Sequence, residues 1–491
     1  MFKRKFTIVI SLILISIIFL PSVKAEEELN EALFYDLIKT ENEKPEIKIP
    51  DYEKIELDNG LTAYLVKDSE YPITEVTGFI TGGRRKESSD IAGISDIMLK
   101  MMSTGTKNLD EEEYVEEKEL HGIDISFGVN NDTFDFRGSS LSSETKNLLS
   151  LIADSLKNPD FEASYFQRIL QEQNQYLAQA TVQADHLLNS NFFKNIYGNH
   201  PYSFANNIEL KRSKLRTFSP KKLRNFYNNS IGPENMVMSV VGDINIEKTK
   251  EIIKDNFANW EEQNIAINKA EINEMAYDEN KVIVVDKEDA GQAHMKIGHN
   301  FLGHNFERDT EFLIGNRIFG QGGFSSRLME NVRSEKGYVY SIYSNVSYNE
   351  DGGVYYVNTK VDPEKAAEVL NAVKEEMKAI KNGEKKITEE EVYENINLYN
   401  GLMVSNYKHL IDIMNEYIYE VELLGGKSNY LNSFIEEYNN LTATEIQSVM
   451  SDKLQPDKLL TVVVGNSQVL KPVFKEAGYE VEVIKKGNDG F

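Results

Sequence analysis

The chain has 491 residues, a formal net charge of −25 and no cysteine. This charge argues against nucleic acid or an anionic membrane surface as a partner. The absence of cysteine excludes disulfides, thiolate metal ligands and thiol nucleophiles. Hydrophobic residues make up 41% of the chain, which is enough for a large core and two to four domains.

The first 25 residues have the pattern of a secretory signal peptide. Basic residues at positions 3–5 precede an apolar run over residues 6–20, and Val23 and Ala25 form a small-x-small cleavage site. An uncleaved anchor is the alternative, but this run is short for a hydrocarbon core of about 30 Å. We therefore expect cleavage after Ala25, no membrane span in the mature chain, and export to a periplasm or to the cell exterior.

Apolar periodicity divides the rest of the chain into two α+β halves. Residues 52–83 alternate between apolar and polar side chains around an Asp58-Asn59-Gly60 turn, which predicts paired strands. Helical periodicity begins near Ala92 and dominates residues 143–195. The predicted organisation is a signal peptide (1–25), an acidic lead segment (26–48), an N-terminal domain (49–262), a linker (263–279) and a C-terminal domain (280–486).

An internal repeat relates the two halves. Residues 218–243 align without a gap on residues 441–466, an offset of 223 that places Pro233 over Pro456. Both segments have the pattern of a capped helix, a proline turn and a buried strand. We expect each half to pack helices against a largely antiparallel sheet, and the two halves could face each other across a cleft.

Several motifs occur in a fixed order along the chain. The first half contains "LDNGLTAYLV", "ITGGRRKES", "AGISDIMLKMMSTGTKN", "IYGNHPY" and "NNSIGPENMVMSVVGDI", and the second half contains "SSRLMENVRSEKGYVYS". With these motifs the chain resembles the insulinase/pitrilysin family of zinc metallopeptidases over nearly all of residues 50–470. The resemblance implies an α+β fold with two homologous α/β-layer halves that face each other as a clamshell.

The family's inverted zinc motif, H-x-x-E-H, lies on the helix after the GG turn, and this chain lacks it. In the family the two imidazoles chelate Zn²⁺, and the glutamate acts as general base on the metal-bound water. The matching positions here are Asp96, Leu99 and Lys100. The third ligand, a glutamate, would fall near Leu177, with Glu172 as the nearest acid. The resemblance therefore implies a degenerate motif and no metal in this chain.

A small ion pair is expected where the family holds its metal. Asp96 and Lys100 are four residues apart on a helix with the acid first. That arrangement predicts a favourable pair worth about 0.3–0.5 kcal/mol.

The histidines do not suggest another metal site. His294, His299 and His304 are spaced by five residues, which places neighbours on opposite faces of a strand, whereas zinc requires convergent ligands. Neither H-E-x-x-H nor H-x-x-E-H occurs in the chain. These observations argue against a self-contained zinc peptidase.

The second half contains the residues that the resemblance assigns to the peptide. In the family, an arginine and a tyrosine seven residues later hydrogen-bond the carbonyl near the scissile bond and stabilise the developing oxyanion. The matching pair is Arg333 and Tyr340. Tyr338 is the alternative, since it would share a strand face with Tyr340. Arg333 and Tyr340 are therefore the candidate catalytic residues, acting on a substrate in trans.

The segment "FGQGGFSSRL" is rich in glycine but lacks the Lys-Ser/Thr ending of a phosphate-binding loop. Its position resembles the glycine-rich loop of the non-catalytic subunits of mitochondrial processing peptidase. By that resemblance Gly322, Gly323 and Phe324 are candidate substrate-binding residues. The alternative is a helix-entry turn with Phe324 packed inward.

Two further segments predict structure rather than chemistry. Residues 83–88, "GRRKES", have the composition of a solvated turn. Thr388 and Glu391 have the spacing of a capping box at the start of a helix.

The resemblance implies a division of labour between two chains. This chain would be the exported non-catalytic subunit of a heterodimer, without a cofactor of its own and inactive alone. Its partner would be a relative with the H-x-x-E-H motif and zinc, and the substrates would be peptides. The alternatives are a structural protein without catalysis, and a homodimer that binds peptides without cutting them.

Overall fold

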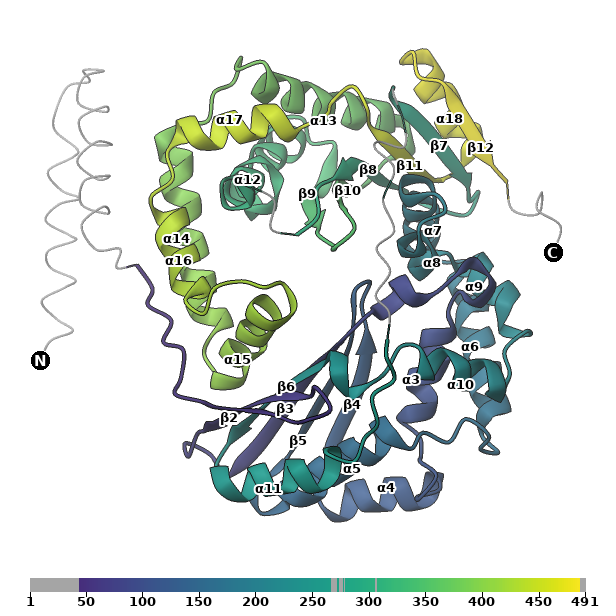
Figure 1. The fold of residues 1–491 in the computed structure, drawn as a ribbon. Helices are drawn as coiled ribbons and strands as arrows, with labels where there is room; N and C mark the ends of the chain where they lie inside the picture. The colour runs from purple at the N-terminus through teal and green to yellow at the C-terminus, as the bar shows by residue number, and fades with distance from the viewer. Residues whose placement is uncertain (1–43, 266–271, 273–276, 278, 305–306, 486–491) are drawn as a thin grey trace, which may run out of the picture. The chain divides into compact units, whose positions relative to one another are not determined.

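Two six-stranded sheets form the framework of the chain (Figure 1). The computed structural model describes residues 44–265, 272, 277, 279–304 and 307–485. The predicted signal peptide (1–25), most of the lead segment (26–48) and most of the linker (263–279) lie outside these residues. Both sheets belong to one unit that begins at Glu46. Within the described residues, no helix is both long enough and apolar enough to cross a membrane.

The first sheet has the strand order β1-β2-β6-β3-β5-β4. Its strands are β1 (Glu53–Glu56), β2 (Thr62–Lys67), β3 (Ile73–Thr81), β4 (Asp124–Val129), β5 (Thr133–Leu141) and β6 (Met236–Gly242). The α-helices of this half are α3 (Ile94–Met102), α4 (Glu111–Leu120), α5 (Thr145–Lys157), α6 (Phe166–Ala180), α7 (Ala184–Tyr197), α8 (Pro201–Asn206), α9 (Ile208–Leu215), α10 (Pro220–Asn228) and α11 (Ile246–Phe257). Its short helical turns are η2 (Gly83–Lys86), η3 (Ser89–Ile91), η4 (Ser142–Glu144) and η5 (Pro233–Asn235).

The second sheet has the order β12-β7-β11-β8-β10-β9. Its strands are β7 (Lys281–Asp286), β8 (Ala293–Phe301), β9 (Val339–Ser347), β10 (Gly353–Val361), β11 (Leu460–Gly465) and β12 (Val481–Ile484). The α-helices are α12 (Asp309–Asn316), α13 (Ala366–Lys381), α14 (Glu389–Asn406), α15 (Leu410–Ile418), α16 (Tyr430–Asn439), α17 (Ala443–Lys453) and α18 (Ser467–Glu476). The short turns are η6 (Arg317–Gln321), η7 (Gly323–Ser325), η8 (Met329–Glu335), η9 (Pro363–Lys365) and η10 (Tyr419–Leu423), of which η6, η8 and η10 are π-helical.

The internal repeat is confirmed by the pairing of the strands. Strand β6 runs parallel to β2 and antiparallel to β3. Its counterpart β11 runs parallel to β7 and antiparallel to β8. The remaining pairs are antiparallel except at one edge, where β12 pairs parallel to β7 but β1 pairs antiparallel to β2. Both halves are therefore α+β layers with mainly antiparallel sheets, as the sequence predicts.

Strand β6 is apolar on both faces because both faces are covered. Met238 and Val240 point into the main core of the first half. Val237 and Val241 point to the opposite face, because successive side chains alternate along a strand. This explains why the segment "MVMSVVG" reads as a continuous buried run rather than an alternating one.

The helix that covers this second face of each sheet comes from the other half of the chain. Helix α15 packs Met414 and Ile418 against β2, β3 and β6 of the first sheet. Helix α7 packs Leu188 and Phe192 against β7, β8 and β11 of the second sheet. Figure 1 shows both helices against the sheets that they cover. The two halves are thus joined by a reciprocal exchange of helices.

Candidate functional site

Three side chains that the sequence singles out in the second half lie together. The guanidinium carbon of Arg333 lies 4.4 Å from the ring centre of Phe324 and 5.2 Å from that of Tyr340. Phe324 is 73% exposed and Tyr340 is 83% exposed. We refer to Phe324, Arg333 and Tyr340 as the aromatic–arginine cluster. The alternative in which Phe324 packs inward is wrong, because its ring lies exposed at the surface against the arginine.

The glycines before Phe324 are required by the local backbone. Gly323 has a φ of +80°, which favours glycine. A Cβ atom on Gly322 would lie 2.6 Å from both the carbonyl oxygen of Arg317 and the side-chain oxygen of Asn395. Tight packing and a left-handed turn therefore bring Phe324 out to solvent.

The cluster is built from π-helical and edge-strand segments. Arg333 lies on η8, and Tyr340 is the second residue of β9, which is an edge strand of its sheet. The π-helical turn η6 precedes the glycines. Such turns are uncommon in proteins, and those that occur are often found at functional sites. Tyr338 does not join the cluster, because its ring packs toward the core and beneath the ammonium of Lys365.

The chemistry available to the cluster is hydrogen-bond donation to a carbonyl. A guanidinium presents several N–H donors in a fixed plane, and stacking on two rings limits its freedom while its charge is retained. The phenol of Tyr340 adds an O–H donor. Fixed donors of this kind stabilise negative charge on a carbonyl oxygen. No acid or base in the cluster would attack a peptide bond by itself.

In the first half, α3 lies where the family places its zinc helix. A buried glutamate caps its N-terminus: the Glu87 carboxylate accepts the backbone N–H groups of Gly93 at 2.7 Å and Ser95 at 3.2 Å. Gly93 has a left-handed φ of +84°. A carboxylate is favourable at this end of a helix. The helix therefore keeps a defined start even though it lacks the metal ligands.

Asp96 does not form the predicted pair with Lys100. Its carboxylate lies 2.6 Å from the guanidinium of Arg84 and 2.9 Å from the ammonium of Lys211. Burial opposes its ionisation, yet Lys211 and Arg84 together hold the pKa of Asp96 at about 2. Arg84 and Lys211 thus take the place of the expected partner Lys100, because both reach the mostly buried carboxylate.

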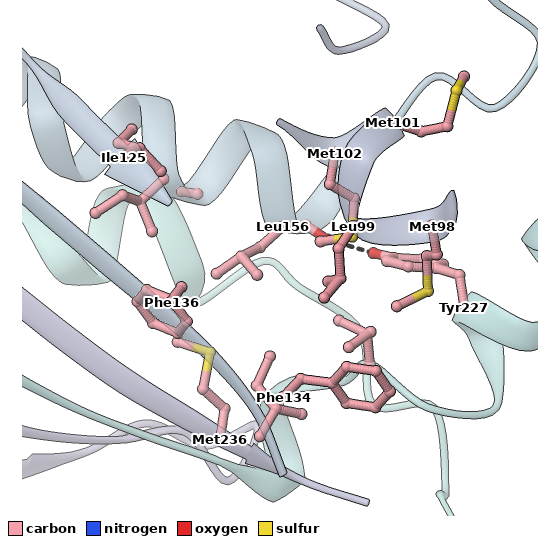
Figure 2. Close-up of a cluster of buried hydrophobic side chains, with 14 of the residues drawn as sticks. Met98, Leu99, Met101, Met102, Ile125, Phe134, Phe136, Leu156, Tyr227 and Met236 are labelled. Carbon is pink, nitrogen blue, oxygen red and sulfur yellow. Dashed lines mark hydrogen bonds between the residues drawn. The ribbon is translucent and has the colours of Figure 1, made fainter. Parts of the chain in front are cut away.

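The other two motif positions are also incompatible with zinc. Leu99 is buried among the side chains of the first-half core, with Met98 and Met102 beside it (Figure 2). Lys100 donates a hydrogen bond of 2.7 Å to Gln173 on α6. A cation bound by Asp96 would meet the charges of Arg84 and Lys211. The residues present do not fit a zinc ion.

Gln173 is a residue that the sequence did not single out. It lies 5% exposed on α6 and faces Lys100, whereas Leu177 packs in the core one turn later. Glu172 points away and pairs with Arg168 at 2.8 Å. The number of residues between α3 and α6 does not show which residue of α6 faces Lys100 to within one helical turn. A search for a buried polar residue near this position would have found Gln173.

The three histidines of β8 and its end do not converge. His294 lies 2.6 Å from Asp185, His299 is buried beside Tyr355, and His304 meets the ring of Tyr348. No group of three histidine, aspartate or glutamate side chains in the described part of the chain is placed to hold a metal ion.

The burial of His299 predicts a pH dependence of stability. Burial lowers the pKa of His299 to about 4, whereas an unfolded histidine titrates near 6.5. Above pH 6.5 neither state is protonated. As the pH falls from 6.5 towards 4, the unfolded chain takes up a proton that the folded chain does not, and stability is lost. Between pH 7.5 and 5.0 we expect His299 to account for a loss of about 2 kcal/mol in the free energy of unfolding, measured with urea.

The variant His299→Phe should lose that part of the pH dependence. His186→Gln, which removes a half-buried histidine beside Tyr176 on α7, is measured alongside as a reference for the loss of a histidine elsewhere in the chain. Equal pH slopes for the wild type and His299→Phe would contradict the expected role.

Residues 83–88 are not the solvated turn that their composition suggests. They form the short helix η2 and its exit, in which Arg85 and Glu87 are buried. The Arg85 guanidinium lies 2.7 Å from Glu350 and 3.4 Å from Asp132. Because Glu350 belongs to the turn between β9 and β10, this pair joins the two halves, and the carboxylates compensate the buried cation.

Comparison with known proteins agrees with this architecture. The family model described as Insulinase (Peptidase family M16) matches residues 64–203, and that described as Peptidase M16 inactive domain matches residues 217–399. An uncharacterized zinc protease, YmxG of Bacillus subtilis, is 22% identical over 407 residues, which cover 82% of this chain and 96% of the relative. The non-peptidase homolog YmxG of Helicobacter pylori is 21% identical over 397 residues, covering 79% and 88%.

A solved structure gives the same fold. The crystal structure of a peptidase M16 inactive domain from Pseudomonas fluorescens matches with a TM-score of 0.75 at 20% identity and covers 85% of this chain and 98% of that chain. One family model matches in each half, and the positions of the zinc motif are occupied by Asp96, Leu99 and Lys100. The chain therefore belongs to the insulinase family, peptidase family M16, as an inactive-type member without the zinc motif.

Proposed function

We propose that this chain is the exported, non-catalytic subunit of a heterodimeric metallopeptidase of the insulinase family. It binds the substrate peptide through Arg333 and Tyr340, which donate hydrogen bonds to the carbonyl of the bond to be cut. A second chain with an intact H-x-x-E-H motif supplies zinc and the general base. Alone, this chain does not hydrolyse peptides.

The observation that carries the proposal is the contact of the half-buried Arg333 with two exposed aromatic rings. Burial of large apolar surface is the rule in a folded chain, so rings as exposed as Phe324 and Tyr340 are suited to contact with another molecule. In the neighbouring Lys365–Tyr338 pair, by contrast, the tyrosine is half-buried.

The first half supports the same division of labour. Asp96 is neutralised by Arg84 and Lys211, and Leu99 stands where a general base would be needed. A leucine can neither accept nor donate a proton. A metal and a base must therefore come from another chain if the cluster acts in peptide hydrolysis.

A test of this proposal is the purification of the native mature chain from its own cells under mild conditions. Co-eluting proteins are identified by mass spectrometry, and the eluate is assayed with a quenched peptide with and without a chelator. We expect a stoichiometric relative with H-x-x-E-H and cleavage that the chelator abolishes. A self-associated chain that binds peptide without cleavage would overturn the proposal in favour of a binding or scaffold protein.

A further inference from the structure

Arg327 lies in the segment that connects the members of the aromatic–arginine cluster. It is three residues after Phe324 and six before Arg333, between η7 and η8. Its side chain is only 11% exposed, in contrast to the ring of Phe324. The segment therefore presents the cluster on one side and inserts an arginine into the protein on the other.

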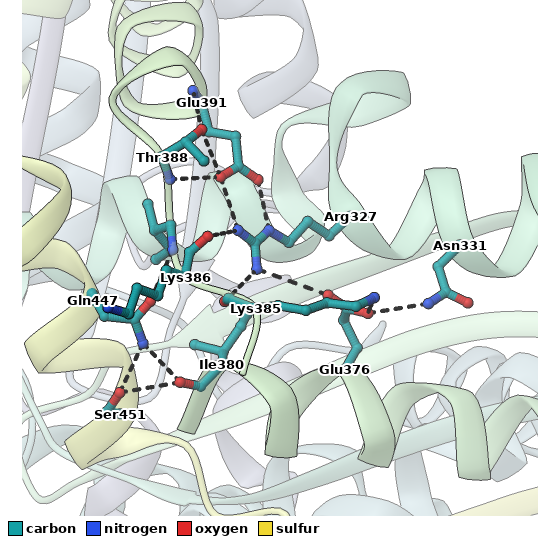
Figure 3. A network of polar contacts seen from close by, with 11 residues as sticks. Arg327, Asn331, Glu376, Ile380, Lys385, Lys386, Thr388, Glu391, Gln447 and Ser451 are labelled. Atoms are coloured by element: carbon teal, nitrogen blue, oxygen red, sulfur yellow. Dashed lines mark hydrogen bonds and ion pairs between the residues drawn. The ribbon is translucent and has the colours of Figure 1, made fainter. Parts of the chain in front are cut away.

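The guanidinium of Arg327 is held by four hydrogen bonds (Figure 3). Its Nε and Nη2 atoms donate to the two carboxylate oxygens of Glu391 at 2.6 and 2.8 Å. Its Nη1 and Nη2 atoms also donate to the backbone carbonyls of Lys385 and Lys386 at 3.0 and 2.8 Å. A two-point contact between guanidinium and carboxylate fixes both distance and orientation.

The carboxylate that receives Arg327 is itself fixed. Glu391 closes the capping box of α14 with Thr388, whose backbone N–H donates to it at 2.9 Å. The predicted capping box is thus confirmed. This glutamate caps a helix and holds an arginine at once, so the anchor for the segment is the start of α14.

A second anchor lies one turn along η8. Glu376 on α13 has a side chain 2% exposed and accepts a hydrogen bond from Asn331 at 3.1 Å. Lys385 lies 2.7 Å from the same carboxylate, and Arg327 lies 3.9 Å from it. Two carboxylates and two cations therefore form a balanced network beneath the segment that carries Arg333.

We infer that Arg327 is a positioning residue for Arg333. The cluster is exposed, its arginine lies on a π-helical turn, and π-helical turns are uncommon. Such a segment needs an anchor if its donors are to be held in one place before a peptide arrives. The inference rests on the proposed function, since it assigns the network a purpose in the work of Arg333.

The test uses the reconstituted complex and four versions of this chain: wild type, Arg327→Met, Arg333→Ala and the double variant. We expect Arg327→Met to lower kcat/KM by about 10- to 100-fold, since a displaced binding group costs rate without touching the substrate. In the Arg333→Ala background the same substitution should change kcat/KM by less than about twofold. Arg327 acts through Arg333, so the effects of the two substitutions do not add. Arg327→Lys, which keeps the charge but loses the two-point contact, should fall between wild type and Arg327→Met.

Arg308→Met is the matched control. Arg308 also combines a glutamate, Glu311 at 2.9 Å, with a backbone carbonyl, Glu445 at 2.7 Å, but it joins α12 to α17 away from the segment. It should leave kcat/KM unchanged. Multiplicative losses for Arg327→Met and Arg333→Ala, or an equal loss for Arg308→Met, would overturn the inference.

Hydrogen exchange in the isolated chain separates this inference from the proposed function. Residues 324–336 should exchange faster in Arg327→Met than in wild type, with the other helices of the second half unchanged. If Arg333→Ala leaves hydrolysis unchanged, the proposed function fails, whereas unchanged exchange over residues 324–336 overturns the anchoring by Arg327.

Discussion

Replacing Arg333 with alanine should lower kcat/KM of the zinc-bearing complex by about 10²- to 10³-fold, as expected for the loss of one donor to an oxyanion. The guanidinium is 4.4 and 5.2 Å from the two rings that flank it, so its removal takes away the charged centre of the cluster. The measurement is the initial rate of cleavage of a quenched peptide at substrate concentrations well below KM.

The matched control for Arg333→Ala is Lys365→Ala. Lys365 makes a cation–aromatic contact of 5.5 Å with Tyr338 but lies outside the cluster. Its removal should leave kcat/KM within about twofold of the wild type. Size-exclusion chromatography of each complex distinguishes a loss of catalysis from a loss of assembly. An intact complex with an unchanged rate for Arg333→Ala would refute the role of this residue.

Replacing Asp96 with asparagine should destabilise the chain by about 3 kcal/mol at pH 7, because removing one partner of a buried ion pair leaves the other charges without compensation. Arg84 and Lys211 have side chains only 14% and 10% exposed. Without the carboxylate their charges stay in a mostly buried position with less compensation. The measurement is the free energy of unfolding in urea.

The pH dependence of this contribution follows from the folded pKa of about 2 for Asp96. An unfolded aspartate titrates near 3.9. The stability is therefore fully present above pH 3.9 and is lost as the pH falls towards 2. Asp90→Asn is the control: Asp90 is 89% exposed and lies 3.5 Å from Lys214, so its loss should cost less than about 0.5 kcal/mol. Equal effects of the two variants would contradict a structural role for Asp96.

Local patterns in the sequence predicted the features that depend on nearby residues. The hairpin of β1 and β2 and the capping box of Thr388 involve spacings of a few residues, and turn or cap chemistry determines them. The repeat was visible because helix, turn and strand recur at one offset. The fold of each half follows from these elements and from the family's motifs.

Long-range partners could not be predicted in the same way. Lys211 is 115 residues from Asp96, and no local pattern distinguishes it from the other lysines as the one that reaches the carboxylate. Arg85 looked solvated because its neighbours are charged, but its partners lie 47 and 265 residues away. The family resemblance of the motif around Arg333 and Tyr340 identified the pair, whereas the outward turn of Phe324 depends on the packing around Gly322. The sequence pattern alone gives no sign of this packing.

Because α7 and α15 each cover the sheet of the other half, neither sheet keeps a complete apolar cover without the other half. A chain built in this way is equivalent to a domain-swapped dimer whose two subunits have been fused end to end. If the first half were deleted, the second sheet would lose Leu188 and Phe192 from its apolar face. Substitutions on α3 can therefore remove the zinc ligands from the first half. The first half as a whole must remain, because its helix α7 covers the second sheet.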